Sequence, residues 1–302
     1  GRMTPLHREE WSMYCWENRL TALLLDEVLL HFLAGQRETR LPAAVSCGVA
    51  WGYCMPYRSF GDIPPELFKG RHALVSDIAG PRRTGIVYGG RQFGKTALLR
   101  TVERLAHHPE NRTFVIFEDI KHLGHPSGQD QPERLWIHIR DRLAEHGIVN
   151  KSLRKTESII DEIVAAVDED PSLRIILLLD EADYFLNADA RNQYRELERI
   201  RTLQDKTNDQ VKFVLSGLHN VQRFYKDSNH PLAQLGGAIP IGPLPTHGAR
   251  ALIQEPLYAL GFTFGDDSGS DQDSGERVIL RILSYTNYHP ALIQHFCGEL
   301  VN

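Results

Sequence analysis

The chain has 302 residues, enough to bury a full hydrophobic core in one large domain or two smaller ones. An apolar content of 42% and a net charge of −5 are ordinary for a globular protein, and no overall basic charge indicates a nucleic-acid partner. Four cysteines without a Cys-x-x-Cys pair exclude a disulfide-rich secreted scaffold and indicate reduced thiols. Since neither a signal peptide nor a membrane span is apparent, we expect a cytoplasmic protein without a membrane partner.

The first 65 residues predict a helical extension followed by a linker. Residues 7–35 contain no proline, and no glycine before Gly35, and their second half is apolar except for a narrow polar stripe. Such a pattern predicts a helix that other parts of the protein cover on most sides. Prolines and glycines interrupt residues 36–66, which predicts irregular structure.

Residues 66–245 alternate between strand and helix patterns, after a turn and a short helix at 67–78. Strands are expected at 85–88, 113–118, 175–179, 211–216 and 238–241. Helices are expected at 95–106, 132–146, 157–167 and 188–207. Strands that alternate with helices in this way predict a mainly parallel, five-stranded sheet in a three-layer α/β/α fold.

After residue 245 the sequence predicts only helices. We expect three of them, at 246–260, 276–285 and 290–300. Together they would form a small all-α domain over 246–302. An acidic segment rich in glycine and serine, 265–275, predicts a loop between the first two helices.

A glycine-rich segment between the first strand and the following helix fits the pattern G-x-x-x-x-G-K-[ST]. In such a loop backbone N–H groups surround phosphate oxygens, and the helix adds its positive N-terminal end. Lys95 would reach the β- and γ-phosphates, and the Thr96 hydroxyl would ligate Mg²⁺. The alternative is a tight turn, but the strand before the loop and the helix after it favour phosphate binding. The expected nucleotide contacts are Gly89, Gly90, Arg91, Gln92, Phe93, Gly94, Lys95, Thr96 and Ala97.

A second motif is a run of two isoleucines and three leucines that ends in Asp180 and Glu181. A continuously apolar strand is typical of the buried centre of a parallel sheet. Asp180 would hold Mg²⁺ through water beside Thr96, and Glu181 would act as general base on the attacking water. The alternative is a favourable negative charge at the start of a helix. The catalytic interpretation is favoured because the pair follows a complete phosphate loop.

The strand at 211–216 ends in Ser216. If this strand lay between the two preceding motifs, the serine hydroxyl would be near the γ-phosphate and could position water. An ordinary strand-end turn is the alternative, and His219 or Asn220 are less favoured substitutes for the serine. Arg223 would either approach the γ-phosphate or pair with a carboxylate on the surface.

These segments together resemble P-loop ATPases that have an extra strand between the two nucleotide motifs and a glutamate base. This group includes the AAA+ proteins and their relatives, the signal-transducing STAND ATPases. The stretch that contains Arg71 is similar to the STAND segment that helps to hold adenine, which implies an adenine contact for this residue. Residues 243–300 resemble the STAND helical lid, whose turn, here His289 and Pro290, meets the nucleotide. The alternative for this turn is a plain helix start with proline at the first position.

The resemblance implies an ATP-binding, slowly ATP-hydrolysing switch of a signal-transduction or defence protein, with ATP or ADP and Mg²⁺ as ligands. The state of the nucleotide would determine the position of the lid. Through the lid it would control the assembly of a homo-oligomer or the sensor and effector domains of a larger chain. One alternative is an AAA+ ATPase similar to origin-recognition proteins and helicase loaders, which acts on DNA. Another is a scaffold that binds nucleotide without hydrolysing it. We favour the switch, because neither charge nor motifs indicate nucleic acid.

Overall fold

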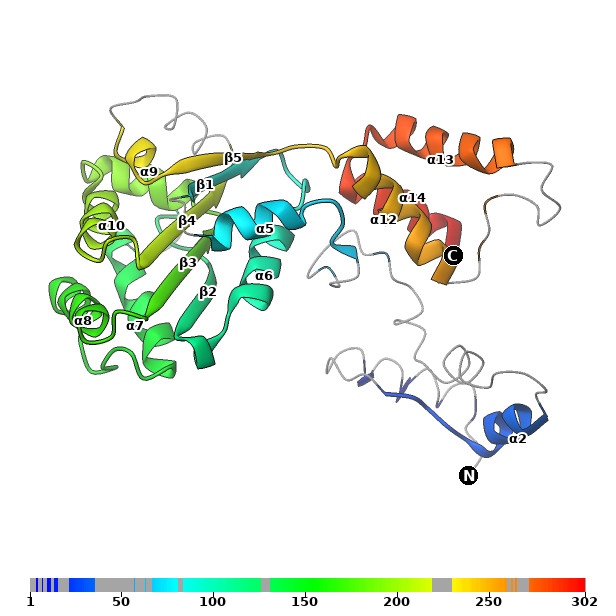
Figure 1. Ribbon diagram of the computed structural model, residues 1–302, viewed down its shortest axis with the longest axis horizontal. Helices are drawn as coiled ribbons and strands as arrows, with labels where there is room; N and C mark the ends of the chain where they lie inside the picture. Colours follow the sequence, from blue (N-terminus) through cyan, green and yellow to red (C-terminus); the bar gives the residue numbers. More distant parts are fainter. Residues whose placement is uncertain are drawn as a thin grey trace. The chain divides into compact units, whose positions relative to one another are not determined.

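The computed structural model describes residues 4, 7, 10, 11, 14, 15, 22–35, 57, 63, 67–80, 84–125, 131–218, 230–259, 262, 264 and 272–301. The chain forms two compact units, Phe68–Gly248 and a second one that joins Gly1–Leu67 to Ala249–Asn302. The first unit contains a sheet with its helices, and the second contains the C-terminal helices (Figure 1). The three domains expected from the sequence stay a prediction.

One five-stranded sheet forms the centre of the first unit (Figure 1). Its strands are β1 (Thr84–Gly89), β2 (Thr113–Asp119), β3 (Arg174–Asp180), β4 (Val211–Gly217) and β5 (Gly237–Ile241). They lie in the order β2-β3-β4-β1-β5, and all neighbouring pairs are parallel. The predicted five-stranded parallel sheet is therefore confirmed, and β4 does lie between the strands that carry the two motifs.

Helices cover both faces of the sheet, because its central strands are apolar on both sides. Within β3, Ile175, Leu177 and Leu179 pack into one buried cluster, whereas Ile176 and Leu178 pack into another. Helices with residues in the first cluster are α7 (Leu135–Glu145), α8 (Thr156–Glu169), α9 (Asp183–Arg191) and α10 (Arg195–Lys206). Helices with residues in the second cluster are α5 (His72–Ala79) and α6 (Lys95–Ala106). This is the three-layer α/β/α fold that the sequence predicts.

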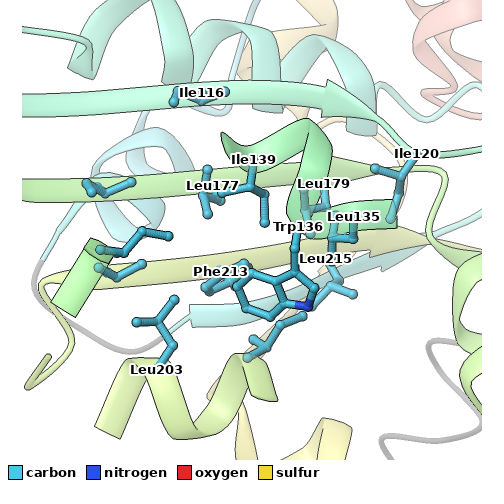
Figure 2. Packing of buried hydrophobic residues seen from close by; sticks show 14 of the residues in the cluster. Ile116, Ile120, Leu135, Trp136, Ile139, Leu177, Leu179, Leu203, Phe213 and Leu215 are labelled. Carbon is cyan, nitrogen blue, oxygen red and sulfur yellow. The ribbon is translucent and has the colours of Figure 1, made fainter. Parts of the chain in front are cut away.

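Trp136 of α7 is a fully buried member of the first cluster. Figure 2 shows its indole beside Phe213 of β4, and the two ring centroids are 6.2 Å apart. The indole Nε1 donates a hydrogen bond of 2.6 Å to the buried carboxylate of Glu196, so its polar atom is satisfied. Short 3₁₀ helices complete this unit, namely η2 (Pro109–Asn111), η3 (Pro132–Arg134) and η4 (Pro231–Gln234).

The single helix expected at 188–207 is wrong, because α9 and α10 are separate helices. Between them Gln193 and Tyr194 adopt left-handed backbone conformations, each with φ 59°. The buried carboxylate of Asp189 accepts hydrogen bonds from two backbone N–H groups in the first turn of α10, at 3.0 Å each. This cap fixes the start of α10 and ends the preceding helix.

The helix expected over residues 7–35 is wrong at residues 22–26, which are not helical. Helix α2 (Glu27–Gly35) begins after Asp26, whose carboxylate accepts the N–H of Leu29 at 2.8 Å. The aspartate is therefore a helix cap, and not part of a polar stripe along a longer helix.

Helices α12 (Thr246–Ala259), α13 (Gln272–Thr286) and α14 (Pro290–Val301) form the C-terminal region, which confirms its expected helical character. A left-handed turn of Asn287 and Tyr288, with φ 47° and 58°, joins α13 to α14. Of the loop predicted at 265–275, residues 272–275 belong to α13 and the rest lie outside the described residues. In the described part of the chain, no helix combines the length and the apolar character needed to cross a membrane.

Candidate nucleotide-binding site

The glycine-rich loop between β1 and α6 requires glycine for three different reasons. A Cβ atom at Gly89 would lie 2.1 Å from the carbonyl oxygen of Ile241 in β5. At Gly90 it would lie 2.6 Å from the ring of Phe93, which packs against the second buried cluster. Gly94 precedes α6 in the left-handed conformation, with φ 89°. The loop is thus a tight backbone turn directly before a helix N-terminus, as an anion-binding loop requires.

Lys95 places its ammonium group against this loop. Its Nζ donates hydrogen bonds to the carbonyl oxygens of Gly89, at 3.0 Å, and Gly90, at 2.8 Å. Burial lowers the pKa of Lys95, and the nearby carboxylates of Asp180 and Glu181 oppose this effect. A cation held by carbonyl oxygens alone can exchange them for phosphate oxygens, which carry more negative charge.

Thr96 and Asp180 bring two oxygen donors together from different elements. The hydroxyl of Thr96, in the first turn of α6, donates a 2.5 Å hydrogen bond to Asp180 Oδ2 at the end of β3. The other oxygen, Oδ1, accepts the backbone N–H of Glu181 at 3.0 Å. A hydroxyl and a carboxylate are hard oxygen ligands, so this pair fits Mg²⁺ in its chemistry.

Glu181 lies in the turn between β3 and α9 and has a left-handed backbone, with φ 56°. Burial raises the pKa of its carboxyl group, and the negative charge of Asp180 raises it further. Lys121 and Lys95 oppose the shift with their positive charges. A glutamate whose proton affinity is increased in this way is suited to accept a proton from water.

Ser216 is on β4, where it pairs with Val87 of β1, two residues before Gly89. Its side chain has 0% exposure, and its Oγ has no hydrogen-bond partner in the described part of the chain. A buried hydroxyl without a partner is unusual, because leaving it unsatisfied typically costs about 1–3 kcal/mol. Its role toward a phosphate or a water stays a prediction.

Two hydrogen bonds connect the end of β4 to the turn that carries Glu181. The N–H of Ala182 donates to the carbonyl oxygen of Ser216 at 2.8 Å. The N–H of Leu218 donates to Asp183 Oδ2 at 2.7 Å. Sequence reasoning did not single out Asp183, and the only available signal was its position three residues after Asp180.

Arg71, directly before α5, is not part of the phosphate loop but contacts it through its side chain. Its Nη1 donates to the carbonyl oxygen of Phe93, and its Nη2 donates to the carbonyl oxygen of Gly242, just after β5. Burial lowers the pKa of this guanidinium to about 10. The adenine contact that the resemblance implies for Arg71 stays a prediction.

For the remaining expected site residues, the described part of the structure shows no contact with the phosphate loop. His289 and Pro290 belong to the second compact unit, and the prediction of a nucleotide contact for them stands untested. The candidates His219, Asn220 and Arg223 lie outside the described residues. Arg91 and Gln92, within the loop, are exposed.

A protein-family model and several solved structures are similar to this chain. A family model of an AAA domain matches residues 78–224. No curated protein sequence matches the chain. The Walker-type ATPase paby2304 of Pyrococcus abyssi has a similar fold, with a TM-score of 0.59 and 15% identity over 82% of this chain and 71% of that one. The chain therefore has the fold of AAA+-related P-loop ATPases.

Two further solved structures are more distant. The ORC1 protein of Aeropyrum pernix in complex with DNA has a TM-score of 0.49 and 14% identity over 80% of this chain. AMPPCP-bound DnaA of Aquifex aeolicus has a TM-score of 0.39 and 16% identity over 73% of this chain. In each case this chain spans 63% of the other protein's length.

The expectation that nothing indicates nucleic acid is wrong and is corrected here. It depended on net charge and on motifs, whereas one of the solved structures that the chain matches is the ORC1 protein in complex with DNA. Net charge describes the whole chain and does not exclude a local basic surface.

Proposed function

We propose that this chain binds ATP together with Mg²⁺ and hydrolyses it to ADP and phosphate. The observation that carries the proposal is the 2.5 Å contact between Thr96 and Asp180, with Glu181 next in the chain. It joins the first turn of the helix after the glycine-rich loop to the end of a buried strand, which supports assigning these residues to one nucleotide site.

Each residue has a distinct task in this proposal. Lys95 and the loop N–H groups would bind the β- and γ-phosphates, and Thr96 and Asp180 would hold Mg²⁺, which neutralises phosphate charge when bound. Glu181 would take a proton from the attacking water as the water oxygen bonds to the γ-phosphorus. The bond from that phosphorus to the bridging oxygen breaks, and ADP leaves. Ser216 would orient the water.

Titration of nucleotide and measurement of phosphate release test this proposal. We expect Lys95→Ala to weaken ATP binding by about tenfold or more, since it removes a charged hydrogen bond to phosphate. We expect Glu181→Gln to retain binding but to lower kcat by about 10²- to 10⁴-fold, the usual contribution of a general base. Removal of Mg²⁺ by EDTA should abolish turnover.

Lys151→Ala, at an exposed turn lysine, is the matched control and should change neither quantity. Wild-type affinity in Lys95→Ala would exclude the phosphate loop as the binding site. Tight binding without turnover in the wild-type chain, unaltered in Glu181→Gln, would instead support the nucleotide-binding scaffold.

Two finer hypotheses differ in the partner that the nucleotide controls. One is the STAND-type switch of signal transduction or defence, in which the C-terminal helices act as a lid and His289 and Pro290 contact the nucleotide. The other is an ATPase that acts on DNA, which the similarity to the DNA-bound ORC1 structure suggests. The resemblance in residues supports the first hypothesis, and the similar solved structures fit the second better.

Binding of labelled duplex DNA, measured by fluorescence anisotropy with ATP or ADP present, separates the two hypotheses. A DNA-acting ATPase should bind in at least one nucleotide state, and its affinity should fall steeply as salt rises, because phosphate contacts release counterions. A switch without DNA contacts should show no saturable binding in either state. Binding that does not respond to salt would count against the DNA hypothesis.

A further inference from the structure

Arg71 is an unusual residue for its surroundings, because its guanidinium is buried beside the phosphate loop. The residue is only 6% exposed. Its two terminal nitrogens donate to backbone carbonyl oxygens, one of Phe93 inside the loop and one of Gly242 after β5. No carboxylate forms an ion pair with it among the residues that the structure describes. The guanidinium therefore connects two backbone segments, and no carboxylate among the described residues compensates its positive charge.

The first of these bonds fixes the orientation of a peptide group in the phosphate loop. The peptide between Phe93 and Gly94 is trans, as are all described peptide bonds. In a planar trans peptide the C=O and N–H groups point in opposite directions. Since the carbonyl of Phe93 is held by Arg71, the N–H of Gly94 must point away from the guanidinium. A rotation of this peptide would break the bond to Arg71.

Position 94 requires glycine, both because Arg71 lies close to it and because its backbone is left-handed. A Cβ atom there would lie 3.2 Å from Nη1 of Arg71, and the backbone has a left-handed φ of 89°. Gly94 also immediately precedes α6, so its N–H belongs to the group of free amides at a helix N-terminus that bind anions. The hydrogen bond from Arg71 thus holds the last peptide group of the loop, directly before the first turn of α6.

A second, independent contact holds the segment that carries Arg71. Gly70 has a left-handed φ of 73°, and a Cβ atom on it would lie 2.7 Å from the Cα of Gly248. A Cβ atom on Gly248 would in turn lie 2.6 Å from the Cα of Gly70. Two glycines allow these backbones to pack directly on each other. The backbone next to Arg71 is therefore anchored, which a residue that positions another group requires.

We infer that Arg71 is a positioning residue for the triphosphate: it orients the Phe93–Gly94 peptide so that the Gly94 N–H is available to phosphate. This inference rests on the proposed function, since it names how the same loop is prepared for its ligand. It differs from the adenine contact that the resemblance implies, because it predicts an effect on phosphate affinity without an effect on base selectivity.

The positive charge of Arg71 adds to this effect. Burial without a counter-charge from the described residues is unfavourable for the guanidinium, and a polyphosphate in the loop would supply negative charge nearby. The bound anion and the guanidinium therefore stabilise each other even without direct contact. Both effects act on any polyphosphate, whether or not it carries a base.

Calorimetric titration with three ligands tests the inference: ATP, GTP and inorganic tripolyphosphate, each with Mg²⁺. We expect Arg71→Ala to weaken all three by the same factor, about tenfold, the usual loss for one hydrogen bond to a charged group. The ratio of ATP to GTP affinity should stay at its wild-type value. A residue that contacts adenine would change this ratio and leave tripolyphosphate binding unaltered, and that result would overturn the inference.

Arg140→Ala is the matched control. Arg140 is 5% exposed and also donates to a backbone carbonyl, but it is on α7, on the other face of the sheet. Its substitution should lower stability and leave all three affinities unchanged. Equal losses of affinity in the Arg140 and Arg71 variants would show a general effect of lost stability and overturn the inference.

Arg71→Lys keeps the charge but offers a single amine in place of a two-armed guanidinium. This variant replaces Arg71→Ala in the titrations if Arg71→Ala does not fold. Its loss of affinity should be smaller than that expected for Arg71→Ala and the same for all three ligands. Wild-type tripolyphosphate affinity in this variant would overturn the inference. If the wild-type chain itself binds neither ATP nor tripolyphosphate, the proposed function fails, and this outcome is distinct from a failure of the Arg71 inference alone.

Discussion

In the proposed reaction, with Glu181 as general base, ATP hydrolysis should decline on the acid side of its pH profile at a higher pH than it would with an ordinary glutamate as the base. Burial, and secondarily the charge of Asp180, raise the pKa of its carboxyl group above the usual value of about 4.3. A general base works only when deprotonated, so kcat/KM should fall as the pH drops through this raised pKa. The measurement is a pH–rate profile of the wild type beside Glu181→Gln. This acid-side decline should vanish from the residual activity of the variant, and its persistence would assign it to another group.

The same shift affects stability with a definite sign. The folded chain binds the Glu181 proton more tightly than the unfolded chain, so its stabilising contribution is complete below the ordinary pKa. That contribution is lost as the pH rises through the folded-state pKa. Glu181→Gln should therefore melt at a higher temperature than the wild type at neutral pH, and the difference should disappear in acid. The same change at the exposed Glu198 should leave the melting temperature unaltered.

For individual residues, the sequence predicted which side chains belong to the candidate site better than it predicted their hydrogen-bond partners. Lys95 and Thr96 were recognised because a motif fixes both residue type and spacing, and Asp180 because it ends a continuously apolar strand, although the roles of all three are still proposals. The acceptors of Arg71 were not predictable, because the direction of the Phe93 carbonyl depends on how the loop folds. For the same reason the contact of Asp183 with the N–H of Leu218 had no signal in the sequence.

Among the elements, α10 depends on a residue outside it. Asp189 of α9 is 0% exposed and accepts the N–H groups of Glu196 and Leu197. We expect Asp189→Ala to lower the free energy of unfolding by about 2–4 kcal/mol, because it leaves two buried donors without partners. Asp189→Asn should cost less, since the amide oxygen still accepts. Urea denaturation measures both variants.

Glu198→Ala, at an exposed site of the same helix, is the control and should change stability by less than about 0.5 kcal/mol. A similarly small effect of Asp189→Ala would mean that α10 starts without this cap. The break between α9 and α10 escaped prediction because apolar residues continue with helical spacing across it. The left-handed residues at the break, Gln193 and Tyr194, are not glycines and therefore gave no turn signal.

For the whole molecule, the class of fold was predictable and the arrangement of strands was less so. Alternating strand and helix patterns are sufficient to predict a parallel sheet between two helix layers. Each buried strand has the same apolar pattern, however, so periodicity alone does not determine which strands are neighbours. The place of β4 beside β1 came from a resemblance, and the structure agrees with it.

The strand order also determines when, during synthesis, the phosphate loop acquires its shape. Strand β1 ends in that loop, yet both of its neighbours, β4 and β5, are made later. A nascent chain that has only reached β3 has no native partner for either edge of β1, although β1 can already pack against α6, which follows it in the chain. The loop therefore acquires its neighbouring strands only after β4 and β5 have been made, so a nucleotide that binds it as proposed would act late in folding. Such a nucleotide would stabilise the first unit once its sheet is complete as far as Ile241.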